Sequence, residues 1–130
     1  MRAPCVLLVL AHDDARELMA SALREAGFEV RAAVDAPTAL EILYRSPPVA
    51  LLVADFPGHQ LAVTRLRREP SLAKVPLLAV CQGASAAPDE AVAFIRTPAG
   101  TRDLLEWTYL LTGTDPEAME HRSVLRLATG

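Results

Sequence analysis

The sequence is poor in cysteine and in aromatic residues, and neither sign of charge dominates it. Its two cysteines, Cys5 and Cys81, are too few for a disulfide framework, and no Cys/His spacing typical of a metal site occurs. Aromatic residues make up only 5% of the chain, which favours helices packed on a buried sheet over an aromatic-rich β-sandwich. The formal charge of −3 argues against nucleic acid as a partner, because no basic run is dense enough to override it.

The sequence also lacks an apolar run that is long enough to cross a membrane. The run over residues 5–11 is far too short for a span and leads directly into charged residues, and no signal peptide precedes it. We therefore expect a reduced, cytoplasmic protein with no membrane partner. The 130 residues fit one hydrophobic core. We expect a domain over residues 4–113, followed by a helical extension or tail over residues 114–130.

What the sequence does contain is an alternation of strand-like and helix-like segments. Continuous apolar runs over residues 5–11, 49–54 and 75–80 are typical of strands buried on both faces of a parallel sheet. Residues 28–32 alternate between apolar and polar, as in an edge strand, and residues 91–95 form a short fifth run. Helical patterns separate these runs, so the sequence predicts an α/β fold with a doubly wound, five-stranded parallel sheet.

Capping residues and apolar spacing define the helices between these strands. The first helix is expected to be capped by Asp13 or Asp14 and to end at Gly27, and the second to start at Asp35. The last helix is expected to run from residue 101 or 102 to residue 111, stopping near a glycine. The positions expected to face inward in the first and last helices are Leu18, Met19, Ala22, Leu23, Ala26, Leu104, Leu105, Leu110 and Leu111.

Several stretches, taken in order, are similar to one family with this fold class. Residues 16–30 resemble its first helix and second strand, residues 39–43 its second helix, and residues 66–70 with 75–78 its third helix and the approach to its fourth strand. Over residues 5–111 the sequence therefore resembles the CheY-like receiver domain of bacterial response regulators. The resemblance implies a flavodoxin-like fold and a setting in two-component signal transduction, that is, in a phosphorelay.

The resemblance weakens where the family has its fourth helix. Residues 82–89 are rich in Gly, Ala, Ser and Pro, which predicts a loop. Between Cys81 and Phe94 the chain is also several residues shorter than the family pattern. We therefore expect the fourth helix to be shortened or missing.

The resemblance also implies a pocket for phosphoryl transfer. In the family, an aspartate after the third strand accepts the phosphoryl group, and two acidic residues after the first strand hold Mg²⁺. A Ser or Thr after the fourth strand and a Lys after the fifth bind the phosphoryl oxygens. Asp55 stands at the phosphoacceptor position. The other positions form a vestigial pocket: Leu10 and Ala11 replace the acidic pair, Cys81 replaces the Ser or Thr, and Thr97 replaces the Lys.

Two assignments stay open on the sequence alone. A shifted register brings Asp13 and Asp14 into the acidic role, but it requires a deletion before Arg16, and the alternative is that one of these acids caps the helix. Asp55 is either the phosphoacceptor equivalent or a turn or cap residue, because the loop over residues 56–59 is several residues shorter than in the family.

These departures lead us to expect a degenerate pseudo-receiver that binds protein partners and is not switched by phosphorylation. Phosphoryl transfer depends on positioning and charge neutralisation, and the Lys and the acidic pair that provide them are missing. One alternative is a genuine phosphoacceptor, phosphorylated on Asp55 by a histidine kinase. A second is a binder of a small ligand in the vestigial pocket.

The expected partners and cofactors follow from this reading. We expect no enzymatic activity and no cofactor, with Mg²⁺ needed only in the phosphoacceptor alternative. Signalling proteins, such as a histidine kinase or another regulator, and a second copy of the chain are the expected partners. Trp107 and Tyr109 of the last helix point in well separated directions, so we expect one of them at the surface, where it can anchor a partner.

Overall fold

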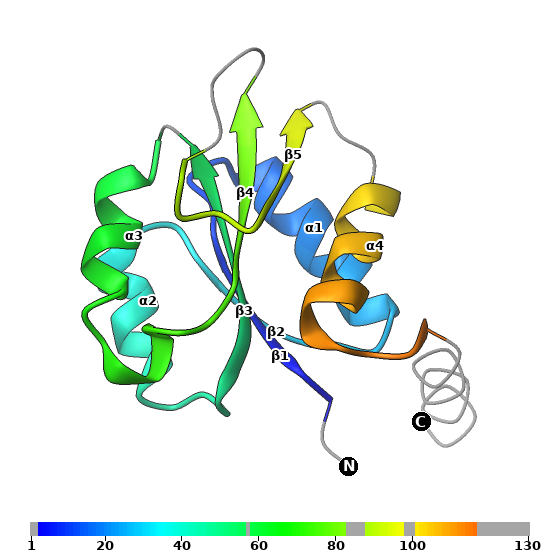
Figure 1. Cartoon of the computed structure of the whole chain (residues 1–130), viewed down its shortest axis with the longest axis horizontal. Coiled ribbons are helices and arrows are strands. Elements are labelled where there is room, and N and C mark those ends of the chain that lie inside the picture. Colours follow the sequence, from blue (N-terminus) through cyan, green and yellow to red (C-terminus); the bar gives the residue numbers. More distant parts are fainter. Residues whose placement is uncertain (1–2, 57, 83–87, 98–100, 117–130) are drawn as a thin grey trace.

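The computed structural model describes residues 3–56, 58–82, 88–97 and 101–116. Within these residues one parallel sheet has the strand order β2-β1-β3-β4-β5 (Figure 1). This is the flavodoxin-like order, and the predicted doubly wound, five-stranded α/β fold is confirmed. The strands are β1 (Cys5–Val9), β2 (Glu29–Ala33), β3 (Val49–Phe56), β4 (Leu77–Gln82) and β5 (Ala93–Thr97). The helices are α1 (Asp13–Glu25), α2 (Ala36–Leu43), α3 (Gln60–Leu66), the short 3-10 helix Pro70–Leu72 and α4 (Thr101–Thr112).

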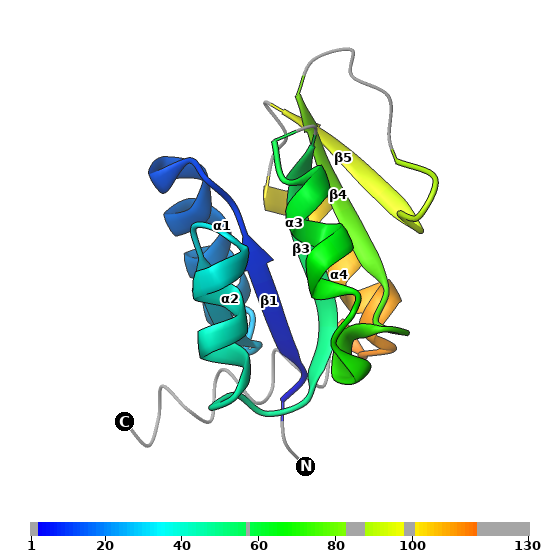
Figure 2. The same ribbon diagram turned by 90° about the vertical axis from the view of Figure 1, so that its left-hand side faces the viewer.

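Helices cover the sheet on both of its faces. α2 and α3 lie against one face and α1 and α4 against the other (Figures 1 and 2). Alternate residues of β1 therefore enter different cores: Leu7 and Val9 pack on the side of α2 and α3, whereas Val6 and Leu8 pack on the side of α1 and α4. A strand covered on both faces needs an apolar side chain at every position, which explains the continuous apolar run of β1.

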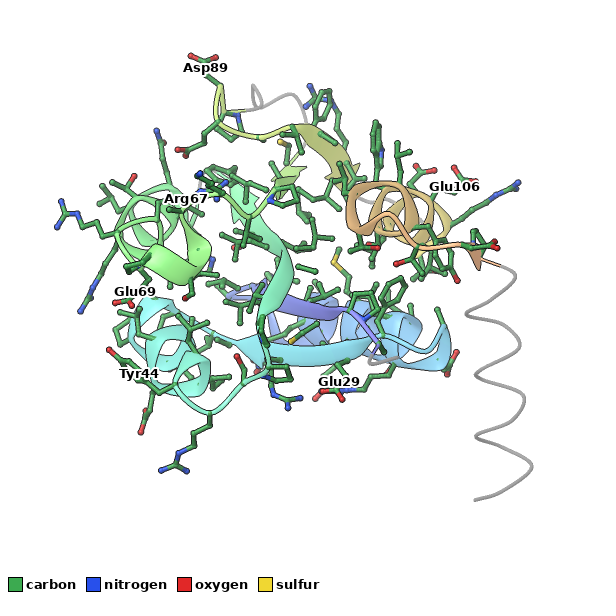
Figure 3. All side chains as sticks on the ribbon, turned by 60° about the horizontal axis from the view of Figure 1, so that its bottom comes forward. Glu29, Tyr44, Arg67, Glu69, Asp89 and Glu106 are labelled. Atoms are coloured by element: carbon green, nitrogen blue, oxygen red, sulfur yellow. The ribbon has the colours of Figure 1, made fainter. Side chains whose placement is uncertain are left out.

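Arg67 joins the end of α3 to the segment that leads into β4. Its guanidinium donates to the carbonyl oxygen of Leu72 at 2.8 Å and also to that of Val75. In Figure 3 Arg67 lies within the molecule, whereas Tyr44 and Glu106 point away from it. These hydrogen bonds fix the segment that precedes β4 against the end of α3.

β3 is longer than the apolar run over residues 49–54 predicts, and this changes the setting of Asp55. The strand continues because Asp55 and Phe56 pair with Val80 and Cys81 of β4. The alternative in which Asp55 is a turn or cap residue is therefore wrong, since Asp55 is a strand residue and the N-cap residue of α3 is His59.

β4 and β5 each begin two residues later than predicted. Pro76 has no N–H group, so the regular ladder of β4 starts only at the next residue, although the Pro76 carbonyl accepts from the Leu52 N–H at 3.0 Å. Val92 donates to the Leu77 carbonyl at 3.1 Å, and the pairing of β5 follows from Ala93 onward. β2 and β5 are the two edge strands of the sheet, as predicted for the alternating segment.

The helix stops and one of the caps agree with the sequence. Gly27 has φ 102° and Gly113 has φ 66°, the left-handed conformation that glycine adopts without strain. The carboxylate of Asp35 accepts from the backbone N–H of Thr38 at 2.9 Å and caps α2.

The predicted cap of α1 is wrong. The N-cap residue is His12, which makes no side-chain cap hydrogen bond. Asp13 and Asp14 lie one step later, inside the first helical turn, where negative charge interacts favourably with the helix N-terminus.

Two of the predicted inward positions face solvent. Leu18 is 58% exposed and Leu110 is 69% exposed, whereas Ala20 and Thr108 are buried. The hydroxyl of Thr108 donates to the Leu104 carbonyl at 2.7 Å, so its burial leaves no polar group unpaired. A pattern based on apolar residues alone cannot anticipate a threonine that satisfies its hydroxyl within its own helix.

Trp107 and Tyr109 are both partly buried, and their place at a partner surface stays a prediction. Both pack against the core on the side of α1 and α4. The ring centroid of Tyr109 lies 5.4 Å from that of Phe28. The strongly exposed apolar residue of α4 is Leu110.

The connection between β4 and β5 agrees with a shortened or missing fourth helix. Residues 88–92, its described part, are not helical, and residues 83–87 lie outside the described residues. The side chain of Phe94 is 44% exposed on β5, so part of the apolar surface of this strand is uncovered. The predicted extension over residues 114–130 lies outside the described residues from residue 117 onward. No helix of the described part is long and apolar enough to cross a membrane.

Candidate functional site

The candidate site lies at the carboxyl edge of the sheet, between β1 and β3. In this strand order the chain winds in opposite directions on either side of these two strands, and the resulting crevice is where doubly wound folds bind ligands. Val9 pairs with Ala54, which brings Leu10 level with Asp55. The fold therefore places two of the predicted pocket positions side by side.

Asp55 is held by a residue that follows it closely in the chain. The carboxylate Oδ1 of Asp55 is in hydrogen-bond contact with Nδ1 of His59, and the two side chains are only 13% and 10% exposed. The backbone N–H of His59 also donates to the Asp55 carbonyl at 2.9 Å. An ionised carboxylate only accepts hydrogen bonds, so the contact requires a proton on Nδ1.

The second carboxylate oxygen of Asp55 faces Gly58. A Cβ atom placed on Gly58 would lie 3.3 Å from Oδ2, which is tighter than an ordinary contact. Glycine therefore allows the turn after β3 to pass close to the carboxylate. Both oxygens of Asp55 are approached by the segment that directly follows it.

The end of β1 offers no carboxylate to this site. Leu10 is buried, and its backbone N–H donates to the Ala33 carbonyl at 3.1 Å. The Leu10 carbonyl accepts from the guanidinium of Arg16 at 2.8 Å. Ala11 is exposed. Mg²⁺ needs several oxygen ligands, and neither side chain can supply one.

The alternative acids, Asp13 and Asp14, lie on α1 rather than on the end of β1. With Ala11 and His12 they line an open depression of about 450 Å³. Asp13 is paired with Arg16. In the described residues no three His, Cys, Asp or Glu side chains are arranged to hold a metal ion. The residues present at this edge therefore do not fit the Mg²⁺ site that the receiver family implies.

The two remaining pocket positions end β4 and β5. Cys81 is fully buried in the core on the side of α2 and α3, and its neighbours in the ladder are Phe56 and Arg96. Thr97 pairs with Gln82 in the sheet, but its side chain lies outside the described part of the structure. Arg96 is exposed, and its guanidinium carbon stands 5.0 Å from the centre of the Phe94 ring.

A second carboxylate, that of Asp35, belongs to the same edge of the sheet. The hydrogen bonds from Thr38 lower the pKa of Asp35, desolvation opposes them, and the charge of His59 has the smallest effect of these. Asp35 is fully exposed, so solvent weakens all of these effects.

The contact of His59 with Asp55 was not predicted. His59 is the last residue of the loop over residues 56–59, which is shorter than in the receiver family. Two signals pointed to it: its spacing of four residues from Asp55, and the shortness of the connection, which leaves it little room to turn away. Arg16 was likewise not assigned to the site, although it binds the carbonyl of Leu10.

The fold is that of response regulator receiver domains. A putative response regulator from Chloroflexus aurantiacus superposes with a TM-score of 0.74 at 22% identity, covering 86% of this chain and 99% of that one. The chemotaxis response regulator CheY4 of Vibrio cholerae gives 0.69 at 19% identity, with 84% and 98% covered. A response regulator receiver modulated diguanylate cyclase from Pelobacter carbinolicus gives 0.71 at 20% identity, with 92% and 97% covered.

These likenesses establish the fold and leave the activity to be argued from the site. Each identity lies below 25%, and one fold can carry unrelated functions. No protein-family model matches the sequence, and no curated protein matches it.

Proposed function

We propose that the chain is a degenerate receiver of a two-component pathway, which acts by contact with protein partners and is not switched by phosphorylation. The observation that supports this most is the end of β1. Leu10, level with Asp55, is buried and apolar, and Ala11 carries no ligand group. The phosphoryl oxygens and the carboxylate of Asp55 would both be negatively charged, and no Mg²⁺ held at the end of β1 would offset their repulsion.

Without the acidic residues that hold Mg²⁺, phosphoryl transfer to Asp55 should be very slow. Its catalysis consists almost entirely of positioning and neutralising the transferred group. Cys81 is a weak donor at the position of a hydroxyl, and its full burial keeps it in the core. The receiver fold is retained, and in this proposal its function is to bind other proteins through its surface. In this proposal the chain is a cytoplasmic adaptor, not an enzyme, and needs no cofactor.

The partner surface that we propose is centred on α4. Leu110 is strongly exposed there, and Trp107 and Tyr109 of the same helix are partly buried. Phe94 on β5 is also exposed, but it lies on the opposite face of that strand from Ile95, which packs on the side of α4. Exposed large apolar side chains of this kind are common anchors at protein interfaces. The partner is a signalling protein, such as a histidine kinase or another regulator, or a second copy of the chain.

Phosphorylation by a small donor tests the proposal. Purified protein should be incubated with acetyl phosphate and millimolar Mg²⁺ and its intact mass compared with that of an ordinary receiver treated in parallel. We expect the ordinary receiver to gain a phosphoryl group and this chain to keep its mass. A phosphorylated species mapped to Asp55 would refute the proposal. It would support the phosphoacceptor alternative, which the position of Asp55 near the end of β3 favours.

A further inference from the structure

We propose that the short connection between β3 and α3 closes on Asp55, and that His59 is a built-in latch which occupies the carboxylate. This inference deepens the proposed function and rests on it in one respect, namely that Asp55 is not used for phosphoryl transfer. It adds a specific role for Asp55, whose carboxylate binds His59 of the same chain, so that this contact closes the pocket.

The two oxygens of Asp55 are enclosed in different ways by the same segment. His59 contacts Oδ1 through Nδ1, and the backbone of Gly58 passes Oδ2 closely enough that a Cβ atom would lie 3.3 Å away. The main chain closes over the same span, since the His59 N–H donates to the Asp55 carbonyl at 2.9 Å. Side chain and backbone therefore hold residues 55 and 59 together at once.

The surroundings of the pair strengthen its hydrogen bond. Leu10, which directly follows β1, and Val80 on β4, which pairs with Asp55, are 1% and 3% exposed. With His59 and Asp55 themselves largely buried, water screens the pair weakly. A charge-assisted hydrogen bond in such a setting is stronger than one at the surface.

The latch also fixes the start of α3. His59 is the N-cap residue of α3, and its carbonyl accepts from the Val63 N–H at 2.9 Å. The contact with Asp55 therefore ties the first turn of the helix to the end of β3. A partner that binds this edge of the sheet meets a surface held in one arrangement.

Chemical labelling of carboxylates tests the latch. Carbodiimide with an amine nucleophile modifies accessible carboxylates, and mass mapping gives the rate at each residue, with exposed Asp14 as the internal standard. In the parent protein we expect Asp55 to react about tenfold more slowly than Asp14, the ratio that corresponds to roughly 1.4 kcal/mol. His59→Ala should remove this protection, and His59→Gln, whose amide can still donate, should restore part of it.

A matched control separates the latch from general loosening of α3. Leu61 is 86% exposed on the same helix, so Leu61→Ala should leave the Asp55 rate unchanged. The latch is refuted if Asp55 of the parent reacts as fast as Asp14, or if a folded His59→Ala variant keeps its protection. These results are independent of the acetyl phosphate test, so the latch and the proposed function can fail separately.

A spectroscopic measurement on the parent protein needs no variant. Long-range ¹H–¹⁵N correlation of the histidine rings reports which ring nitrogen carries a proton. We expect a protonated Nδ1 at His59, because Nδ1 must donate to the Asp55 carboxylate. An unprotonated Nδ1 would show that His59 does not donate to the carboxylate and would overturn the proposal even if His59→Ala failed to fold.

Discussion

Replacing Asp55 by asparagine should change the stability of the fold in opposite directions in an acidic phosphorylation pocket and in a pocket closed by His59. In a pocket where several carboxylates crowd together, removing one negative charge relieves repulsion and stabilises the fold. Here the neighbour of Asp55 is the ring of His59, so Asp55→Asn weakens an attractive contact, because the amide oxygen can still accept from Nδ1 but carries no charge. We expect the variant to be less stable than the parent.

The structure sets the size of this effect. The two side chains are 13% and 10% exposed, so solvent discounts the interaction only a little. A hydrogen bond to a charged group contributes about 1.5–3 kcal/mol to the free energy of unfolding and a neutral one about 0.5–1.5 kcal/mol, so the substitution should cost about 1–1.5 kcal/mol. For a chain of 130 residues this corresponds to a melting temperature lower by about 4–6 °C, at an unfolding entropy of about 2.1 cal/mol/K per residue.

A double-mutant cycle isolates the pair. Urea unfolding of the parent, Asp55→Asn, His59→Gln and the double variant should be followed by circular dichroism. The double variant should lose about 0.5–1 kcal/mol less than the two single losses added together. Glu41→Gln, an exposed change on α2, should stay within about 0.5 kcal/mol of the parent. A neutral or stabilising effect of Asp55→Asn, or additive losses, would refute the reasoning.

Four further outcomes are expected. Millimolar Mg²⁺ should not raise the melting temperature, and a rise that Asp55→Asn abolishes would reveal a metal site. Asp35→Asn should be less stable than the parent at pH 7. The folded state lowers the pKa of Asp35 below its unfolded-state pKa near 3.8, so the ionised carboxylate stabilises the fold above that pH. The difference between the two proteins should disappear as the pH falls below 3.8 through the folded-state pKa, and urea unfolding at several pH values measures it. Leu52→Ala should cost about 2–5 kcal/mol in urea unfolding, since Leu52 is fully buried in β3, and a cost below about 1 kcal/mol would contradict its place in the core. Trp107→Ala and Tyr109→Ala should weaken self-association in light scattering or partner capture in pull-downs, and unchanged association and partners in both folded variants would place the contact elsewhere.

Features with a strong local cause were predictable from the sequence. Gly27 stops α1 because its backbone adopts a positive φ, and Asp35 caps α2 through one short-range hydrogen bond. The continuous apolar runs indicated strands covered on both faces, and the structure has helices on both faces. Such signals depend on a few neighbouring residues, so a single sequence contains them in full.

Features that depend on contacts across the fold were missed. The strand β3 extends through Asp55 because β4 lies beside it, which the apolar run could not reveal. Leu110 was predicted inward although it is 69% exposed, because the rotation of α4 is set by its packing on the sheet. His59 has no signature of its own, and its contact with Asp55 follows from a short connection folded in three dimensions.

If Asp55 does not accept a phosphoryl group, as we propose, it should not bind a phosphate mimic either. ¹H–¹⁵N spectra should be recorded while Mg²⁺ and beryllofluoride are added to the full chain. We expect the backbone signals of Asp55, Gly58 and His59 to stay in place, because the carboxylate is already occupied and no metal ligand replaces the acidic pair. Saturable shifts of these signals at equimolar mimic, absent in Asp55→Asn, would contradict the account.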